Sequence, residues 1–437
     1  MGSYPHIFRV KQLFESPTIH DVPGEIRAQL ATLQLGQKIK PGQSVAVTCG
    51  SRGIAHIKEI IRTIVQHLKD LGAKPFIVPA MGSHGGGTAA GQRQVIEGYG
   101  ITEEFCGCPI RSSMETVIVC KTAEGIPVHF DKNAFSADHV FVCGRIKPHT
   151  RFVGDIESGL MKMMLIGLGK HEGAKIYHRA IQSHSFGQII RSVAQQVIEK
   201  CRIVAGLAIV ENHRDETAKI VAVRPADFEA RERELLVLAK EWLPRLPFDR
   251  ADVLIVDEIG KNISGLGLDA NVVGRKFNDH EPRADEFPKI KRIVIRSLTP
   301  ETHGNATGIG IAEFCAARVV REMDRNSTAI NCITGDHPTA AMTPIHFETD
   351  RELLDAALQT IGLVEPPDAR LMWIRNTLDL GELELSAAYL PEAQSRSDLT
   401  ILAPPRPMEF NAEGNLPWLK SSSNAHLTPV ALDDDEV

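Results

Sequence analysis

The apolar positions of this chain follow two patterns that alternate along most of its length. Short continuous apolar runs, typical of buried strands, alternate with stretches in which apolar residues recur at helical spacing. In the first half, strands are predicted at 43–49, 74–79, 116–120, 137–143, 203–210 and 219–223. Helices are predicted at 22–35, 55–71, from 89 onward, and at 155–165, 173–180, 186–200 and 225–242. This alternation predicts a parallel sheet covered by helices.

A second unit of the same kind begins at Ala251. Strands are predicted from 251 and at 292–295, 369–375 and 383–388, with a helix at 312–321. The run E-W-L-P-R-L-P-F-D-R, with two prolines, is the predicted linker. We therefore expect two α/β domains with largely parallel sheets, residues 1–246 and 251–419, and an active site in the cleft between them. Residues 1–43 are expected to form an irregular lead-in with one helix, and 420–437 a flexible acidic tail.

Composition narrows the class of protein. The 437 residues are 43% apolar and 24% charged, as in a soluble globular protein with sizeable cores. The net charge of −6 gives no reason to expect nucleic acid. No window approaches a membrane span, and the N-terminus lacks the apolar core of a signal peptide, so a cytoplasmic location is expected. The eight cysteines are expected to be mostly buried, and Cys106-Gly107-Cys108 alone is a weak indication of zinc.

Four polar segments fall at or just after the carboxyl ends of predicted strands in the first domain. They are 50–53, 82–88, 147–150 and 162–178. Ligands of open α/β sheets bind at that edge, so four polar segments there predict a site, although any one of them could be only a turn. The segments G-S-R-G and G-S-H-G-G-G-T lead into helices, whose N-termini could hold a phosphate or carboxylate. Neither matches the usual ATP or dinucleotide motifs.

The side chains in these segments suggest acid/base and nucleophilic chemistry. Arg52 offers a bidentate partner for a carboxylate or phosphate. His84 and His149 form a plausible pair of acid/base groups, because imidazoles titrate near neutrality. Lys162 lies in the apolar stretch G-L-M-K-M-M-L-I-G-L, where desolvation would make its amine nucleophilic, unless its head reaches solvent. For His178, a packing or capping role is the simpler alternative.

These residues together resemble the lactate racemase family, whose members use a nickel-pincer nucleotide (pyridinium-3,5-bisthiocarboxylic acid mononucleotide with nickel). In that family a lysine holds the cofactor through a thioamide, and a histidine sixteen positions later binds nickel. Lys162 and His178 have this separation. The two acid/base histidines of the family correspond to His84 in G-S-H-G-G-G-T and to His149 in K-P-H-T.

Two further motifs of the family are matched in part. Its D-x-T-R motif, which contacts cofactor and substrate, corresponds to Cys49, Gly50, Ser51 and Arg52. The arginine is kept, serine replaces threonine, and Cys49 replaces aspartate. In the second domain, G-L-D-A-N-V-V-G-R-K resembles the D-x-N-…-K segment of the family. There Gly274 replaces glutamine, and Arg275 or Lys276 takes the place of the lysine.

The resemblance implies a racemase or epimerase of a 2-hydroxy acid that acts by proton-coupled hydride transfer. One histidine takes the hydroxyl proton while the Cα hydride moves to the pyridinium ring, and the other histidine supplies the proton after the hydride returns to the opposite face. Arg52 would hold the substrate carboxylate, with Lys147, Arg275 and Lys276 as further substrate contacts. Cations around His149, namely Arg145, Lys147 and Arg151, would suit a dicarboxylate such as malate or a longer polar 2-hydroxy acid. The alternatives are that these charges are solvated or bind the cofactor phosphate.

The resemblance also implies partners and sets the competing hypotheses. The expected partners are the small 2-hydroxy acid and the enzymes that synthesise the cofactor, without which Lys162 is expected to stay unmodified. One alternative is a zinc or iron enzyme in which His84, His149 and His178 are the ligands. Another is a non-catalytic protein that binds a nucleotide or an organic acid. The sequence does not fix the oligomeric state.

Overall fold

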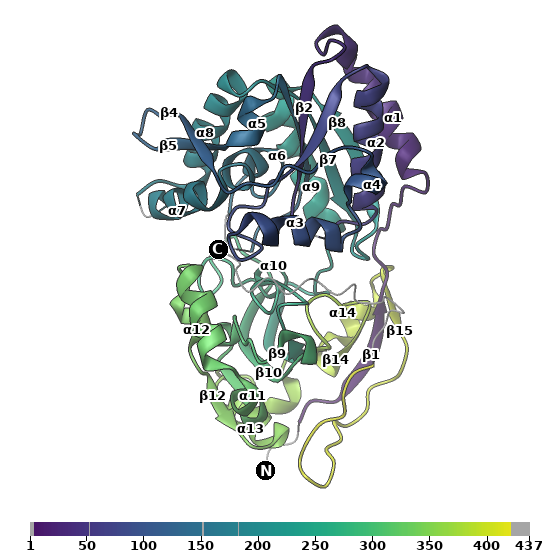
Figure 1. Cartoon of the computed structure of the whole chain (residues 1–437). Helices are drawn as coiled ribbons and strands as arrows, with labels where there is room; N and C mark the ends of the chain where they lie inside the picture. Colours follow the sequence, from purple (N-terminus) through teal and green to yellow (C-terminus); the bar gives the residue numbers. More distant parts are fainter. Residues whose placement is uncertain (1–3, 52, 151–152, 182, 421–437) are drawn as a thin grey trace. The chain divides into compact units, whose positions relative to one another are not determined.

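The computed structural model describes residues 4–51, 53–150, 153–181 and 183–420, and the side chains of His178 and Thr334 lie outside the described part. The chain divides after Leu243 into two compact units, traced by colour in Figure 1. We call residues 16–243 the N-terminal unit. The residues from Pro244 onward, joined by those up to Glu15, form the C-terminal unit. The division falls inside the proline-containing stretch that was predicted as a linker.

The N-terminal unit is built on a five-stranded sheet of order β3-β2-β6-β7-β8. Its strands are β2 (Ser44–Cys49), β3 (Lys74–Pro79), β6 (His139–Arg145), β7 (Ile203–Glu211) and β8 (Thr217–Val223). The first four run parallel, and β8 pairs antiparallel with β7. In register, Val47 of β2 lies between Ile77 of β3 and Phe141 of β6. The predicted α/β class with a largely parallel sheet is confirmed.

Helices cover both faces of this sheet because successive strand residues point to opposite sides. Val45 and Val47 face a core with α1 (Val22–Leu33) and α2 (Ile57–Asp70). Ala46 faces a second core with α6 (Leu160–Lys162), α8 (Phe186–Lys200) and α9 (Phe228–Trp242). Figure 1 shows α1 and α2 on one side of the strands and α5, α6 and α8 on the other.

Shorter elements complete this unit. They are η1 (Leu35–Gln37), α3 (Ala89–Gly98), α4 (Glu103–Cys106), the hairpin β4 (Thr116–Lys121) and β5 (Pro127–Asp131), α5 (Lys132–Ser136), the π-helix η2 (Met163–Gly167), α7 (Lys170–Ala180) and η3 (Pro225–Asp227). The predicted helix over 155–165 begins only at Leu160 and continues as the π-helix. Single π-helical turns inside helices often occur at functional sites.

The strand order creates a switch point at the carboxyl ends of β2 and β6. From β2 the chain passes through α2 to β3 on one side, whereas β6 lies on the other side of β2 and leads through α6 and α8 to β7. These two connections use opposite faces of the sheet. Connections that diverge in this way leave a crevice above the strand ends, where ligands of open α/β sheets bind.

The C-terminal unit holds an eight-stranded sheet of order β12-β11-β10-β9-β13-β14-β1-β15. Its strands are β9 (Arg250–Ile259), β10 (Lys289–Leu298), β11 (Phe314–Ala316), β12 (Ile345–Phe347), β13 (Leu371–Ile374), β14 (Glu382–Ser386), β15 (Leu399–Ile401) and β1 (Ile7–Gln12). From β12 to β13 the neighbours are parallel, and the remaining pairs are antiparallel. It is a mixed sheet, parallel over most of its width.

The helices of this unit are short. They are α10 (Ala270–Val273), η4 (Pro300–Thr302), η5 (Ile309–Ile311), α11 (Ala317–Glu322), α12 (Arg325–Thr334), η6 (Pro338–Ala341), α13 (Asp350–Gln359), η7 (Pro366–Asp368), η8 (Ala387–Tyr389) and α14 (Leu390–Gln394). The helix predicted over 312–321 starts five residues late because 314–316 pair with β10 as β11. No helix in the described ranges combines the length and apolar character needed to cross a membrane.

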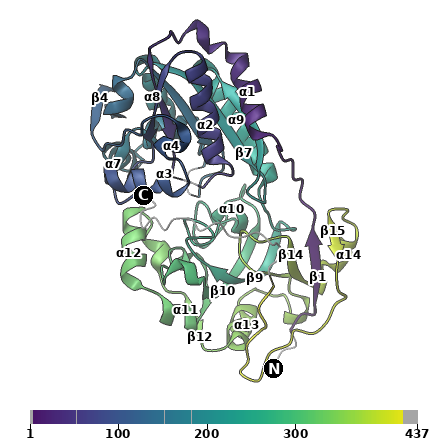
Figure 2. The same ribbon diagram turned by 45° about the vertical axis from the view of Figure 1, so that its right-hand side comes forward.

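The first fifteen residues differ from the prediction, which placed them in the N-terminal domain. β1 pairs with β14 and β15, as Figure 2 shows, so this segment belongs to the C-terminal sheet. Phe8 and Val10 are fully buried in the core of that unit. The predicted boundaries of 1–246 and 251–419 therefore miss this first strand. Its alternation is short, and its partner strand lies more than three hundred residues away in sequence.

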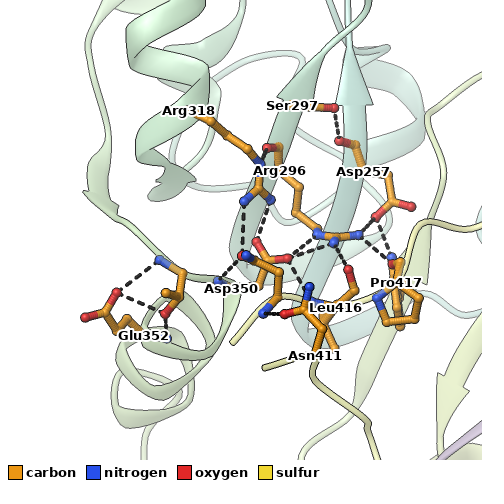
Figure 3. A network of polar contacts seen from close by, with 12 residues as sticks. Asp257, Arg296, Ser297, Arg318, Asp350, Glu352, Asn411, Leu416 and Pro417 are labelled. Carbon is orange, nitrogen blue, oxygen red and sulfur yellow. Dashed lines mark hydrogen bonds and ion pairs between the residues drawn. The ribbon is translucent and has the colours of Figure 1, made fainter. Parts of the chain in front are cut away.

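A buried arginine organises the centre of the C-terminal unit. Arg296 pairs with Asp257 at 2.5 Å and with Asp350 at 2.7 Å, and its guanidinium also donates to the carbonyls of Leu416 and Pro417. Figure 3 shows these contacts from β9, β10, α13 and the last described segment converging on one guanidinium. Residues 416–417 are thereby fixed against the sheet.

Candidate functional site

A hydrogen bond joins the loops that follow β2 and β3. The Ser51 hydroxyl contacts Nδ1 of His84 at short range, and Ser51 itself is buried. The Tyr99 hydroxyl donates to the Ser51 carbonyl at 2.6 Å, which holds the backbone of the first loop. Because the Ser51 hydroxyl contacts Nδ1, it orients the His84 ring.

The loop carrying His84 depends on its glycines. Gly82, Gly85, Gly86 and Gly87 all have positive φ, a region that other residues rarely adopt. At Gly85 a Cβ would also lie 2.6 Å from the backbone nitrogen of Gln92, so glycine permits the close approach of the loop to α3. The run G-S-H-G-G-G is thus a tight turn, and it presents a histidine at the carboxyl end of β3.

Ser83, next to His84, has a buried polar atom that lacks a partner. Its Oγ is buried and has no hydrogen-bond partner among the residues that the structure describes. Leaving a hydroxyl buried and unpaired costs about 1–3 kcal/mol. An unsatisfied hydroxyl beside a histidine, in a glycine loop at a sheet edge, is therefore suited to a polar group of a ligand.

The segment of Lys162 packs over the same strand ends. A Cβ on Gly50 would lie 3.1 Å from the terminal methyl of Met163, and one on Gly144 would lie 3.6 Å from it. A Cβ on Gly82 would lie 3.2 Å from Ile166. The π-helix after Lys162 therefore covers the carboxyl ends of β2 and β6 and touches the His84 loop. Lys162 is half-buried.

The start of the Lys162 helix is held by a buried carboxylate. Glu232 of α9 is fully buried, and its Oε2 accepts from the Met161 N–H at 3.0 Å. Gly159 makes room for it, because a Cβ there would lie 2.5 Å from this carboxyl group. Burial raises the pKa of Glu232 to about 7, against the lowering effect of the N–H groups of Met161 and Leu160. The carboxyl group therefore titrates near neutrality at the base of the Lys162 segment.

His149 lies on a closed loop after β6. Lys147 and Ser158 exchange backbone hydrogen bonds at 3.1 and 3.2 Å and close the loop. The His149 N–H donates to Oε2 of the buried Glu157 at 2.7 Å, and Oε1 of Glu157 pairs with Lys240 at 2.8 Å. Because β6 and β3 flank β2, His149 and His84 are carried by loops on the two sides of β2.

The cations predicted around His149 are only partly available. Arg145 is paired at short range with Glu211, which also accepts from the Ala55 N–H at 2.6 Å. Burial would lower the pKa of Arg145, but the facing carboxylate of Glu211 raises it above its ordinary value. Arg145 is thus used to tie β6 to β7, while Lys147 is half-buried beside the site loop. Arg151 lies outside the described residues.

The residues of the first motif that were predicted to contact the cofactor face different sides of the strand end. Gly50 and Ser51 lie at the end of β2 facing the Lys162 segment and His84. Cys49 points into the apolar core, where burial raises the pKa of its thiol well above the ordinary value. Only the backbone of Cys49 is therefore at the strand end. Arg52 lies outside the described residues, and so does the side chain of His178, which belongs to α7.

Two predicted substrate contacts belong to the C-terminal unit. Arg275 is buried, and its guanidinium pairs with Glu313 at 3.0 Å and donates to the carbonyls of Asp279 and Ile290 at 2.8 Å. It is therefore held in the interior of that unit. Lys276 is half-buried, with its backbone N–H on Glu286. Gly274 ends α10 with positive φ, and a Cβ there would lie 1.9 Å from the Pro288 carbonyl oxygen.

Several residues that shape the site were not predicted. They are Tyr99, Gln92, Glu157, Lys170 and Glu232. One signal was present, because Glu232 follows Phe228 by four positions and precedes Leu236 by four, and so stands at an apolar position of α9. No group of three or more His, Cys, Asp or Glu that could hold a metal ion occurs among the described side chains.

The fold defines an α/β protein with a switch point, and the candidate site lies there, where Ser51, His84 and the segment of Lys162 come together. Residues 16–188 match the family model of the lactate racemase N-terminal domain. Over these residues the N-terminal unit is similar to that domain. The match covers less than half of the chain.

One solved structure that resembles this chain is the lactate racemase apoprotein from Thermoanaerobacterium thermosaccharolyticum. The identity is 15%, the TM-score is 0.44, and the alignment covers 65% of this chain and 69% of that chain. No curated protein matches the sequence. The similarity to the lactate racemase domain is thus confined to residues 16–188.

Proposed function

We propose that this chain is a racemase or epimerase of a 2-hydroxy acid. The observation that carries the proposal is the junction of three segments at the switch point: Ser51 bonded to His84, and the Lys162 segment packed against both loops. An acid/base group, a tethering amine and a glycine loop at one sheet edge match the needs of this reaction. The lactate racemase N-terminal domain match over residues 16–188 supports the same reaction class.

His84 and His149 move the hydroxyl proton in this proposal. Racemisation requires one proton group on each face of the substrate, and the two histidines are carried by loops on opposite sides of β2. The Ser51 hydroxyl keeps Nδ1 of His84 occupied, so the proton is exchanged at Nε2. Glu157 accepts a hydrogen bond from the His149 N–H and so fixes the backbone position from which the imidazole extends.

The residues present fit the nickel-pincer nucleotide. Lys162 offers a half-buried amine for the covalent tether, and His178 on the following helix α7 offers an imidazole for nickel. The unpaired buried hydroxyl of Ser83 and the open space beside Gly86, where a Cβ would meet nothing within 4 Å, leave room for a polar ligand. When bound, the group supplies a hydride acceptor next to the substrate Cα.

Cationic side chains would bind the substrate carboxylates in this proposal. Arg52 would hold the 2-carboxylate, as a guanidinium does in a bidentate pair. Lys147, two residues before His149 on the loop after β6, would contact a second carboxylate, whereas Arg145 is paired with Glu211. A dicarboxylate such as malate is therefore the substrate we propose to test first.

The deciding experiment compares the protein made with and without the enzymes that synthesise the pincer cofactor. Intact mass and peptide mapping should reveal an adduct on Lys162 only after co-expression, and only this sample should interconvert the enantiomers of malate or lactate in a chiral assay. Lys162→Arg keeps the charge but cannot form a thioamide, so it serves as the control. Unmodified protein that contains zinc or iron, or that binds an organic acid without turnover, would overturn the proposal.

A further inference from the structure

Lys170 is a fully buried lysine whose ammonium group contacts three partners. Its Nζ pairs with Oδ2 of Asp131 at 3.1 Å, donates to Oε1 of Gln92 at 3.0 Å, and donates at short range to the Pro79 carbonyl. These acceptors belong to β5, α3 and the end of β3. Lys170 itself begins α7, so one ammonium joins four elements of the N-terminal unit.

Gln92 connects Lys170 to the loop of His84 by hydrogen bonds. Because its Oε1 accepts from Lys170, its Nε2 faces the loop, where it donates to the Gly82 carbonyl at 2.8 Å and to the His84 carbonyl at 3.3 Å. Gln92 is itself completely buried. The backbone on both sides of Ser83 is thus held by one amide whose orientation Lys170 sets.

A lysine at position 170 makes the folded protein less stable than an apolar residue there would. Lys170 has a φ of +56°, a left-handed backbone conformation that is unfavourable for a residue with a Cβ atom. It places a positive charge in the first turn of a helix, where the dipole disfavours cations. Burial lowers the pKa of Lys170 and raises that of Asp131, because both charged forms lose solvation. Buried ion pairs are often replaceable by apolar side chains without loss, so this one calls for another reason than stability.

We propose that Lys170, acting through Gln92, is a positioning residue that keeps the His84 loop aligned with helix α7, which carries His178. The inference rests on the proposed function, in which the proton group and the nickel ligand must meet the same substrate. The His84 carbonyl accepts from Gln92, and His178 lies on the helix that Lys170 begins. Neither Lys170 nor Gln92 is assigned a contact with substrate or cofactor.

The test uses the full chain made without cofactor and measures how fast diethyl pyrocarbonate modifies each histidine, by peptide mapping. Gln92→Glu keeps an acceptor for Lys170 but loses both donors to the loop. Losing two hydrogen bonds of about 1 kcal/mol each should raise the rate at His84 by about tenfold or more. Gln66→Glu makes the same change on the exposed face of α2 and should leave His84 within about twofold of the wild-type rate.

The double variant Lys170→Met with Asp131→Asn removes the contacts of the Lys170 ammonium group without leaving a buried charge. It should speed modification at both His84 and His178, whereas Gln92→Glu should affect His84 alone. The double variant also tests the inference if Gln92→Glu does not fold. Unchanged His84 reactivity in a folded variant would overturn the inference. This readout needs no turnover, so failure to find racemase activity in the loaded wild type would count against the proposed function only.

Discussion

The hydroxyl of Ser51 hydrogen-bonds to Nδ1 of His84 and so joins the loops that follow two adjacent parallel strands. Each loop alone is a glycine-containing turn of a kind that many α/β proteins have. The bond makes them one unit, in which a buried hydroxyl on the loop after β2 sets the orientation of an imidazole on the loop after β3. The acid/base role that we propose for His84 therefore depends on Ser51.

Removing this hydroxyl should slow turnover without unfolding the protein. In Ser51→Ala, the His84 ring loses a hydrogen bond worth about 2 kcal/mol, which corresponds to roughly a 30-fold lower kcat. Ser51→Thr keeps the hydroxyl and should retain most activity. Tyr99 still holds the Ser51 carbonyl in both variants. Steady-state kinetics of the loaded enzymes decide the matter, and equal kcat for Ala and Thr would contradict the role.

Glu157 should matter through its acceptor oxygen more than through its charge. Glu157→Ala removes the acceptor for the His149 N–H and leaves Lys240 unpaired, so the loop loosens and kcat should fall about tenfold. Glu157→Gln keeps an acceptor at that position and should fall much less. If both variants lose activity equally, the pairing with Lys240 is the important contact. Comparing kcat with KM separates the loop effect from substrate binding.

The fold could be predicted where local pattern decides it. The strand Lys74–Pro79 and the helix Phe186–Lys200 were predicted with the bounds that the structure has, because each carries an uninterrupted apolar pattern. β1 was not predicted, since I-F-R-V-K-Q gains its place only by pairing with β14. β11 and β12 have three residues each, too few to show any period.

The site shows the same division between local and distant causes. The His84 loop could be found from its glycines, and Lys162 from its apolar surroundings. Glu232 and Lys170 could not be assigned, because a buried charge takes its meaning from partners far along the chain, here Met161 and Asp131. The direction of Cys49 follows from strand parity once Val45 and Val47 are known to face the same core.

Glu232 should make stability fall as the pH rises from about 4.5 to about 7. Its pKa is raised by burial from 4.5 to about 7, so the folded state binds this proton more tightly than the unfolded state. The stabilisation is complete below about pH 4.5 and is lost between there and pH 7. Glu232→Gln has no proton to lose and keeps an acceptor for the Met161 N–H. The free energy of unfolding of this variant, relative to that of the wild type, should therefore increase by up to about 3 kcal/mol across this pH range.

Urea titrations at several pH values measure this gain. Glu234→Gln, on the exposed face of the same helix, is the control and should run parallel to the wild type. Parallel curves for Glu232→Gln and the wild type would mean that the carboxyl group is ionised throughout. In that case the N–H groups of Met161 and Leu160 would outweigh the loss of solvation.

Arg296 should be the most sensitive polar position of the C-terminal unit. Arg296→Met leaves the buried carboxylates of Asp257 and Asp350 without their shared cation, which typically costs about 3–5 kcal/mol. The carbonyls of Leu416 and Pro417 also lose their donor, so the segment in Figure 3 should become open to limited proteolysis. Arg321→Met removes an exposed pair with Glu348 and should cost less than about 1 kcal/mol. Similar urea midpoints for the two variants would show that the network is dispensable, because other contacts already hold the segment on the sheet.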